Sequence, residues 1–188
     1  VPSSSNYATV TGSSNNVTVT QTGDNNSAQY NITGSKNTYT SSVTGNDNQT
    51  KLTVNNGTVS GSTNAVIQET INGDSNMIIQ NVTTTKNFTS TTSITGNNNQ
   101  VTANIDSGDT SSISNTISGN QNVANIQQTG AGIHTLVMST TGDYNATSIQ
   151  QQGSSNSTVN VQTNGSNNTI TVRTSDQAIV NPMTAIAR

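Results

Sequence analysis

The chain has 188 residues, a formal net charge of −3, 27% hydrophobic residues and only 7% charged residues. So little apolar side-chain area excludes a conventional globular core, while the low net charge is not typical of a disordered chain, which combines low hydrophobicity with high charge. The absence of cysteine excludes disulfides and thiolate metal sites, and the scattered basic residues disfavour nucleic-acid binding.

The first segment, residues 1–11, contains Tyr7-Ala-Thr-Val-Thr11, a short alternation that could add one strand before the repeats. From residue 12 to residue 174 a Gly-x-x-Asn tetrapeptide recurs about every 11 or 12 residues, in two interleaved series. A fixed period of this kind is typical of a stacked array in which each unit supports its neighbours. The more regular series pairs Gly23 with Asn26, Gly45 with Asn48, Gly73 with Asn76, Gly96 with Asn99, Gly119 with Asn122, Gly142 with Asn145 and Gly165 with Asn168.

The second series is looser and is interrupted twice. Its corners are Gly12/Asn15, Gly34/Asn37, Gly61/Asn64, Thr84/Asn87, Gly108/Ser111, Gly130/Ile133 and Gly153/Asn156. Gly57–Ser60 is interpreted as an insertion that forms a bulging loop. Gly130-Ala-Gly-Ile133 has lost the Asn, which we interpret as neutral drift in a corner rather than as a functional site.

The segments between corners alternate apolar residues with Thr, as at Val17 and Val19, and this is the period of a strand with two different faces. Gly tolerates positive φ at a corner, and Asn can bond its own local backbone there. The sequence therefore predicts an all-β fold, a β-solenoid of about seven stacked strand–turn–strand layers with 22–24 residues per layer. Val, Ile, Ala and Leu should fill its thin interior, with ladders of Gln and Asn.

Residues 175–188 depart from the repeat. Ala178-Ile-Val180 is apolar, and Pro182 is expected to break strand pairing. This tail is interpreted as a frayed end, as a segment that docks on the next subunit, or as a cap on the solenoid.

No catalytic or metal-binding constellation is visible, so neither an enzyme nor a cofactor is expected. His134 is the only histidine, and it lies near no Cys or carboxylate cluster in the sequence. Four acids directly follow a turn Gly, and turn chemistry or a gatekeeper role against premature stacking is expected for them. They are Asp24, Asp74, Asp109 and Asp143.

Several Thr-x-Thr pairs invite comparison with ice-binding solenoids, which carry flat ladders of Thr. The pairs Thr18/Thr20 and Thr38/Thr40 lie at different offsets from their corner Asn, and Thr169/Thr171 belongs to a later repeat. A flat array needs one offset throughout, so these pairs do not predict ice binding.

The stretch Asn145-x5-Gln151-x-Gly153-x-x-Asn156-x5-Gln162 resembles the curlin repeat, Ser-x5-Gln-x-Gly-x-x-Asn-x5-Gln, and differs only at its leading residue. Less complete copies begin at Asn15, with Gln21 at the first Gln position, and at Asn122, with Gln128 there. The ladder residues carried by the resemblance are Gln21, Gln128, Gln151 and Gln162. Elsewhere the Gln position holds Val43, Val54, Val82, Ile105 or Ile117.

The resemblance implies a secreted subunit that joins end to end into an amyloid-like fibre for biofilm matrix or surface adhesion. Its partners would be further copies of itself, with secretion or nucleator proteins. An extracellular place also fits a chain that starts at Val1 after signal removal, although a chain shortened at its start would look the same. The alternative function is a β-helical shaft or adhesin, from a phage fibre or a cell surface, that binds host glycans through loops such as Gly57–Ser60. No apolar run is long enough to span a membrane.

Overall fold

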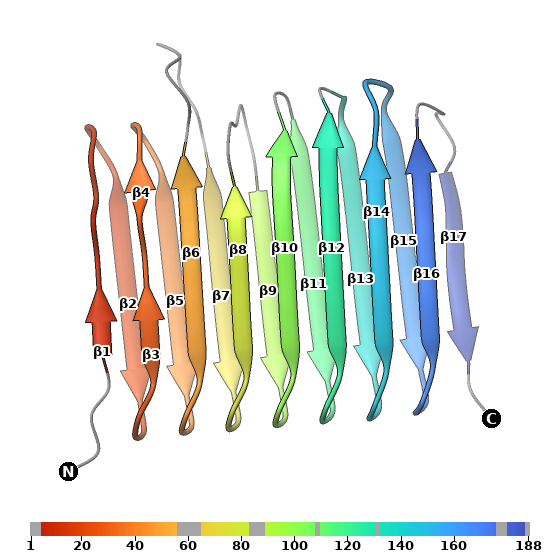
Figure 1. Ribbon diagram of the computed structural model, residues 1–188, viewed down its shortest axis with the longest axis horizontal. Coiled ribbons are helices and arrows are strands. Elements are labelled where there is room, and N and C mark those ends of the chain that lie inside the picture. Colours follow the sequence, from red (N-terminus) through yellow and green to blue (C-terminus); the bar gives the residue numbers. More distant parts are fainter. Residues whose placement is uncertain are drawn as a thin grey trace.

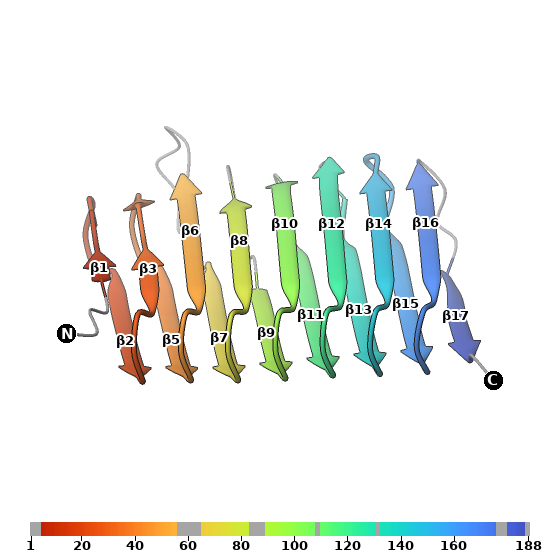
Figure 2. The same cartoon turned by 60° about the horizontal axis from the view of Figure 1, so that its bottom comes forward.

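The computed structural model describes residues 5–55, 65–82, 89–107, 110–130, 132–175 and 180–186. These residues form strands and turns and no helix, and the strands lie in two parallel sheets that face each other. Figures 1 and 2 show the two sheets running along one long axis, with the termini at opposite ends of that axis. The all-β solenoid expected from the sequence is confirmed, and its number of layers is close to the seven expected.

Sheet A is the nearer sheet in Figure 1 and sheet B is the farther one. Sheet A contains β1 (Ser5–Tyr7), β3 (Ser27–Gln29), β4 (Ile32–Thr33), β6 (Gln49–Asn55), β8 (Met77–Val82), β10 (Gln100–Ser107), β12 (Val123–Gly130), β14 (Ala146–Gln152) and β16 (Thr169–Ser175). Sheet B contains β2 (Asn16–Thr22), β5 (Thr38–Thr44), β7 (Val66–Asn72), β9 (Thr89–Thr95), β11 (Ser111–Ser118), β13 (His134–Thr141), β15 (Ser157–Asn164) and β17 (Val180–Ile186).

The chain alternates between the two sheets, so each strand pairs with the strand one layer away in the sequence. All of these pairs are parallel, and equivalent repeat positions lie side by side, as when Val101 pairs with Ala124 and Ile117 with Ile94. The corners set this register, at steps of 22 or 23 residues and one longer step of 28 between Asn48 and Asn76, because a shift by one residue would turn every inward side chain outward.

The interior is a narrow double row of inward side chains. In sheet B one column stacks Val43, Ile71, Ile94 and Ile117 in register, and each is at most 1% exposed. Leu52, Ile78 and Ile126 fill the sheet A side. A small apolar content is sufficient here because strand alternation sends most of it inward.

Both terminal segments contribute a strand. β1 lies within residues 1–11 and pairs with β3, but it ends at Tyr7, where the expected strand Tyr7–Thr11 was to begin; of that stretch, Val10 forms an isolated bridge with Ile32. The expectation that Pro182 breaks pairing is wrong, because β17 pairs with β15 from Val180 to Ile186 and Pro182 lies opposite Asn160. β17 is an edge strand, and proline is tolerated at an edge because its missing N–H can face away from the neighbour. The Gly57–Ser60 loop and the corners at Gly61/Asn64 and Thr84/Asn87 lie outside the described residues, as do Gly108 and Asp109.

Candidate functional site

The corners that lead from sheet B to sheet A stack into a ladder of Asn side chains. Asn122 donates its backbone N–H and its Nδ2–H to Asn99 Oδ1, at 3.0 and 3.1 Å, while Asn99 Nδ2 donates to Gly119 O at 2.7 Å. Asn has an amide short enough to stay in the corner and carries both a donor and an acceptor. The same arrangement repeats along Asn26, Asn48, Asn76, Asn99, Asn122, Asn145 and Asn168.

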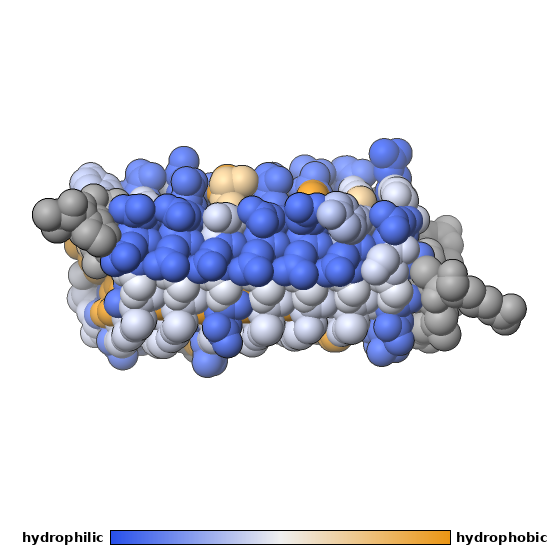
Figure 3. Space-filling model, turned by 90° about the horizontal axis from the view of Figure 1, so that it is seen from below, coloured by the Kyte–Doolittle hydropathy of each residue, from blue (hydrophilic) through white to orange (hydrophobic). Residues whose placement is uncertain are grey.

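These side-chain bonds connect layers, whereas the sequence suggested bonds to the local backbone. A local bond exists at Asn26, whose Nδ2 donates to Thr22 O at 3.3 Å, but its bond to Gly45 O in the next layer is shorter at 2.7 Å. Seen along the corners, the surface is a band of hydrophilic residues that extends over the described length of the stack (Figure 3). The corner Asn therefore helps to hold one layer on the next.

Glycine is required at these corners because the next layer lies against its Cα. Gly119 has φ +135°, and a Cβ there would lie 2.0 Å from the carbonyl oxygen of Gly142. The same close approach exists at Gly23, Gly45, Gly73, Gly96 and Gly142. Gly165 also has positive φ.

The acids that follow the turn glycines take part in a second ladder. Asp74 Oδ1 accepts the backbone N–H of Asn46 at 2.7 Å, and Asp143 Oδ1 accepts that of Asn120 at 2.6 Å. Asp24 donates its own N–H to Asn46 Oδ1 at 2.8 Å. The column runs Asp24, Asn46, Asp74, Asn97, Asn120, Asp143 and Ser166, so at least one neutral residue separates its carboxylates. Asp109 lies outside the described residues.

Two of the four ladder glutamines meet inside the solenoid. Gln128 on β12 and Gln151 on β14 are buried, and Gln128 Nε2 donates to Gln151 Oε1 at 3.0 Å. Gln21 lies in sheet B opposite Val43, and neither of its amide atoms has a partner. The expectation for Gln162 is wrong, because it is exposed on the outer face of sheet B. β15 keeps the register of β13, with Val161 opposite Met138 and Thr163 opposite Thr140, so Val161 and Thr163 point inward and Gln162 points outward.

His134 substitutes for the Asn that the corner at Gly130–Ile133 lacks. It is 0% exposed, its Nε2 lies 3.0 Å from Gly153 O, and its Nδ1 lies 2.8 Å from Ser157 Oγ. A carbonyl oxygen can only accept, so Nε2 donates to Gly153 O. Nε2 thus bonds the Gly carbonyl of the next layer, as Asn15 Nδ2 does to Gly34 O. The interpretation of this corner as neutral drift is therefore replaced by a structural role for His134.

A carboxyl group lies buried among neutral side chains nearer the N-terminal end. Glu69 on β7 is 1% exposed, and it accepts hydrogen bonds from Tyr39 Oη at 2.8 Å and from Gln80 Nε2 at 2.7 Å. Ser90 Oγ donates to Gln80 Oε1 at 3.1 Å and extends the network. Burial raises the pKa of Glu69 to about 7, and the two hydrogen bonds oppose part of that rise. The sequence analysis missed this group, although Glu69 alternates with Ile67 and Ile71 on the inward face.

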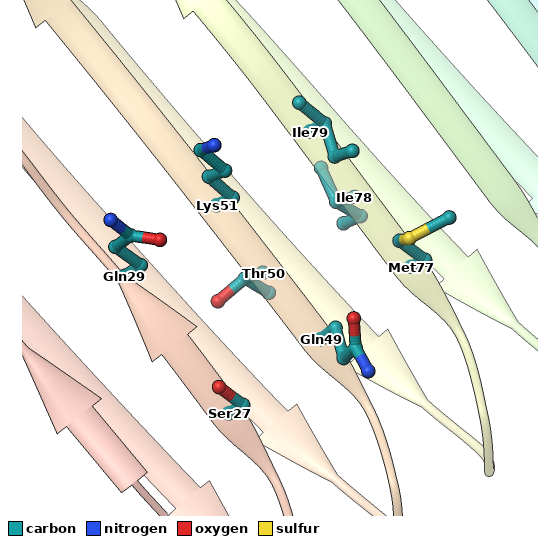
Figure 4. A pocket seen from close by; sticks show the side chains of 8 residues that line it. All are labelled: Ser27, Gln29, Gln49, Thr50, Lys51, Met77, Ile78 and Ile79. Carbon is teal, nitrogen blue, oxygen red and sulfur yellow. The ribbon is translucent and has the colours of Figure 1, made fainter.

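The outer surface of sheet A has a shallow depression over β3, β6 and β8 (Figure 4). Its lining residues are Ser27, Gln29, Gln49, Thr50, Lys51, Met77, Ile78 and Ile79. Lys51 is the one charged side chain among them, so the depression holds no acid–base pair. Within the part of the chain that the structure describes, no cluster of His, Cys, Asp and Glu side chains has the makings of a metal site.

Each end of the stack presents strands with a neighbour on one side only. Among the described strands, β1 pairs with β3 and β2 with β5 at the N-terminal end, while β16 pairs with β14 and β17 with β15 at the other. Asn168 ends the corner ladder: it donates to Asn145 Oδ1 at 3.0 and 2.9 Å, and no described corner follows to bond its own Oδ1. The ends are therefore the places where the repeating bonds of the molecule remain open.

Comparisons of this chain with protein-family models, with curated proteins and with solved structures gave no significant match. Over the described residues, no helix has the length and apolar character needed to cross a membrane.

Proposed function

We propose that this protein is a structural subunit of an extracellular fibre and that it assembles end to end by pairing its edge strands. The observation that supports this most directly is the pair of open ends, β1 and β2 at one and β16 and β17 at the other. Both sheets are parallel throughout, so a second copy in the same orientation would continue both of them. The growing end would then repeat the contacts that already join the layers within one chain.

The corner ladder adds specificity to this pairing. A copy that follows Asn168 would offer donors to its Oδ1 and a carbonyl oxygen to its Nδ2, as Asn145 already finds within the chain. The interior Gln128–Gln151 pair is the kind of ladder that stacked fibres use. Together with the curlin-like repeat at Asn145–Gln162, these features favour a curli-like fibre of a biofilm matrix or an adhesive surface.

In this proposal the protein has no catalytic role and its main partner is another copy of itself, with secretion or nucleator proteins as further partners. The acids at the corners keep their hydrogen-bonding role. Whether Asp24, Asp74 and Asp143 also act as gatekeepers is a separate hypothesis, which neutral Asn variants would test through a shorter lag before polymerisation.

Seeded growth tests the proposed function. Purified protein should elongate from preformed fragments without a lag, and the fibres should give reflections near about 4.7 and 10 Å. Protein that stays monomeric at high concentration and ignores seeds would contradict the proposal. A discrete trimer would instead favour the alternative, a β-helical shaft or adhesin that binds glycans, so the mass distribution should be measured first.

A further inference from the structure

The outer face of sheet B is an array of small, uncharged, hydroxyl-bearing side chains. Alternation sends four positions of each strand outward, and parallel pairing aligns them in columns along the stack. One column is unbroken over six strands and consists of Thr20, Ser42, Thr70, Ser93, Thr116 and Ser139. The three other columns hold mostly Ser or Thr, and their exceptions are Asn, Gln and Val. Among the sheet B strands from β2 to β15, no outward position carries a charge.

The register of the strands removes the sequence argument against such an array. Thr18 pairs with Thr40, each three residues after its corner Asn, and Thr20 pairs with Ser42, each five residues after it. The offset decides only which column a Thr joins, because every outward position belongs to some column. The pair Thr169/Thr171 lies on β16 in sheet A and plays no part in this face.

We propose that the outer face of sheet B binds ice. Neighbouring strands in a sheet are about 4.8 Å apart, and alternate residues along a strand are about 6.7 Å apart. The hydroxyl groups thus form a two-dimensional lattice with spacings close to those of water molecules on the prism planes of hexagonal ice. A ligand that is itself periodic can engage many of these positions at once, which a single small molecule cannot do.

The chemistry of the face favours ordered water. Each Thr offers a hydroxyl group that can join a water lattice and a methyl group beside which water orders, while charged side chains would keep their own hydration shells. On the outer face of sheet A the same lattice is interrupted by Lys51, Met77, Ile79 and Arg173, all of them half-buried or exposed. The two faces of one molecule therefore provide an active surface and an internal comparison.

Other occupants fit this face less well. A second copy laid against it would bury rows of hydroxyl groups, and each one left without a partner costs free energy. Flat sugar rings are usually held by aromatic side chains, and none points outward from the described sheet B strands. An ion would need a charge that the face lacks.

The test uses the full chain and a matched pair of lysine variants. Thr116→Lys places a charge in the unbroken column of sheet B, where Thr116 is exposed, and Asn125→Lys places the same charge on the neighbouring strand β12, on the exposed face of sheet A. Each protein is mixed with slowly growing ice, and its partition into the ice, the shape of ice crystals and the inhibition of recrystallisation are measured. Circular dichroism checks that both variants keep the wild-type fold.

Wild-type protein and the Asn125→Lys variant should enter the ice and facet the crystals. The Thr116→Lys variant should partition into ice about tenfold less, which corresponds to a loss of roughly 1.4 kcal/mol in the free energy of binding to ice. Three results would overturn the proposal: exclusion of the wild type from ice, equal losses in both variants, or a Thr116→Lys variant that changes fibre bundling and leaves ice partition intact. The proposal is independent of end-to-end assembly, because a monomer that fails to elongate from seeds still exposes the face.

Discussion

Glu69 is a buried acid that faces no positive charge. The groups packed around it come from β5, β8 and β9, namely Tyr39, Ser41, Gln80 and Thr92, and of these only Tyr39 is titratable. Tyr39 and Tyr30 lie with their ring centroids 5.2 Å apart, and burial followed by the charge of Glu69 raises the pKa of each. The cluster is therefore most stable when the Glu69 carboxyl carries its proton.

This cluster predicts that the fold is more stable in mild acid. The pKa of Glu69 rises from its ordinary value of 4.5 to about 7 on folding, so the folded state binds the proton more tightly. Between these two values the free energy of unfolding should fall with rising pH, by about 3 kcal/mol in all, and should then level off. Glu69→Gln should abolish this dependence and raise stability at neutral pH, as measured by urea unfolding across the pH range.

Asp47→Asn is the control for that experiment, because it also removes one carboxylate, but from an exposed corner position. It should leave the pH dependence unchanged. A wild-type stability that is flat between the two pKa values, or that rises with pH, would contradict the prediction.

At the residue scale, sequence reasoning succeeds where the partner is the same repeat position one layer away. The corner Asn and Gly residues fall into this class. It fails where the partner is set by which columns face each other across the interior, as for Glu69 on β7 in sheet B with Gln80 on β8 in sheet A. The expectation for Gln162 failed because it was copied from a motif, whereas the alternation of Val159, Val161 and Thr163 already indicates an outward position.

At the scale of the element, the corner is the part most closely determined by its residues. Two positions in each regular corner have positive φ, a Gly and a residue two places later, such as Gly119 with φ +135° and Gln121 with φ +56°. The first is confined to Gly by the carbonyl of the next layer, whereas the second is occupied by Asn, Asp, Ser, Gln or Tyr in different layers. A left-handed conformation costs a non-Gly residue roughly 1–2 kcal/mol, which these corners tolerate at the second position, and the steric contact between layers is what confines the first position to Gly.

Substitutions within one corner should separate the cost of a left-handed backbone conformation from the cost of a steric clash between layers. Gly119→Ala places a Cβ 2.0 Å from Gly142 O and should lower the free energy of unfolding by about 2 kcal/mol or more, because the backbone has to move. Gln121→Gly relieves a left-handed residue in the same corner and should leave stability unchanged or slightly raised. Denaturant unfolding of both variants tests this, and equal destabilisation by the two would show that the contact between layers is unimportant.

At the scale of the whole molecule, the layered architecture follows from the spacing of the corners, and the sequence predicts it well. The tail was harder to predict, because β17 continues the stack without a Gly-x-x-Asn corner of its own series and with Pro182 in the strand. Composition alone cannot identify such a strand, since its pairing depends on the edge that β15 offers. Stability in such a stack is a sum over layers and their nearest neighbours, and not a property of one shared core.

This architecture predicts that one complete layer can be removed. Deletion of Gly96–Ser118 joins Thr95 to Gly119 and removes 23 residues, the same spacing that separates Asn97 from Asn120. It keeps the Glu69 and His134 networks and discards Asn115, a buried side chain whose amide atoms have no partner. Circular dichroism should retain its β signature, and the denaturant m-value should fall in proportion to the lost layer.

Deletion of Gly119–Gly130 alone should abolish folding, because it would bring two successive strands into sheet B without a return strand in sheet A. Tolerance of both deletions would mean that the corners do not set the alternation between the sheets.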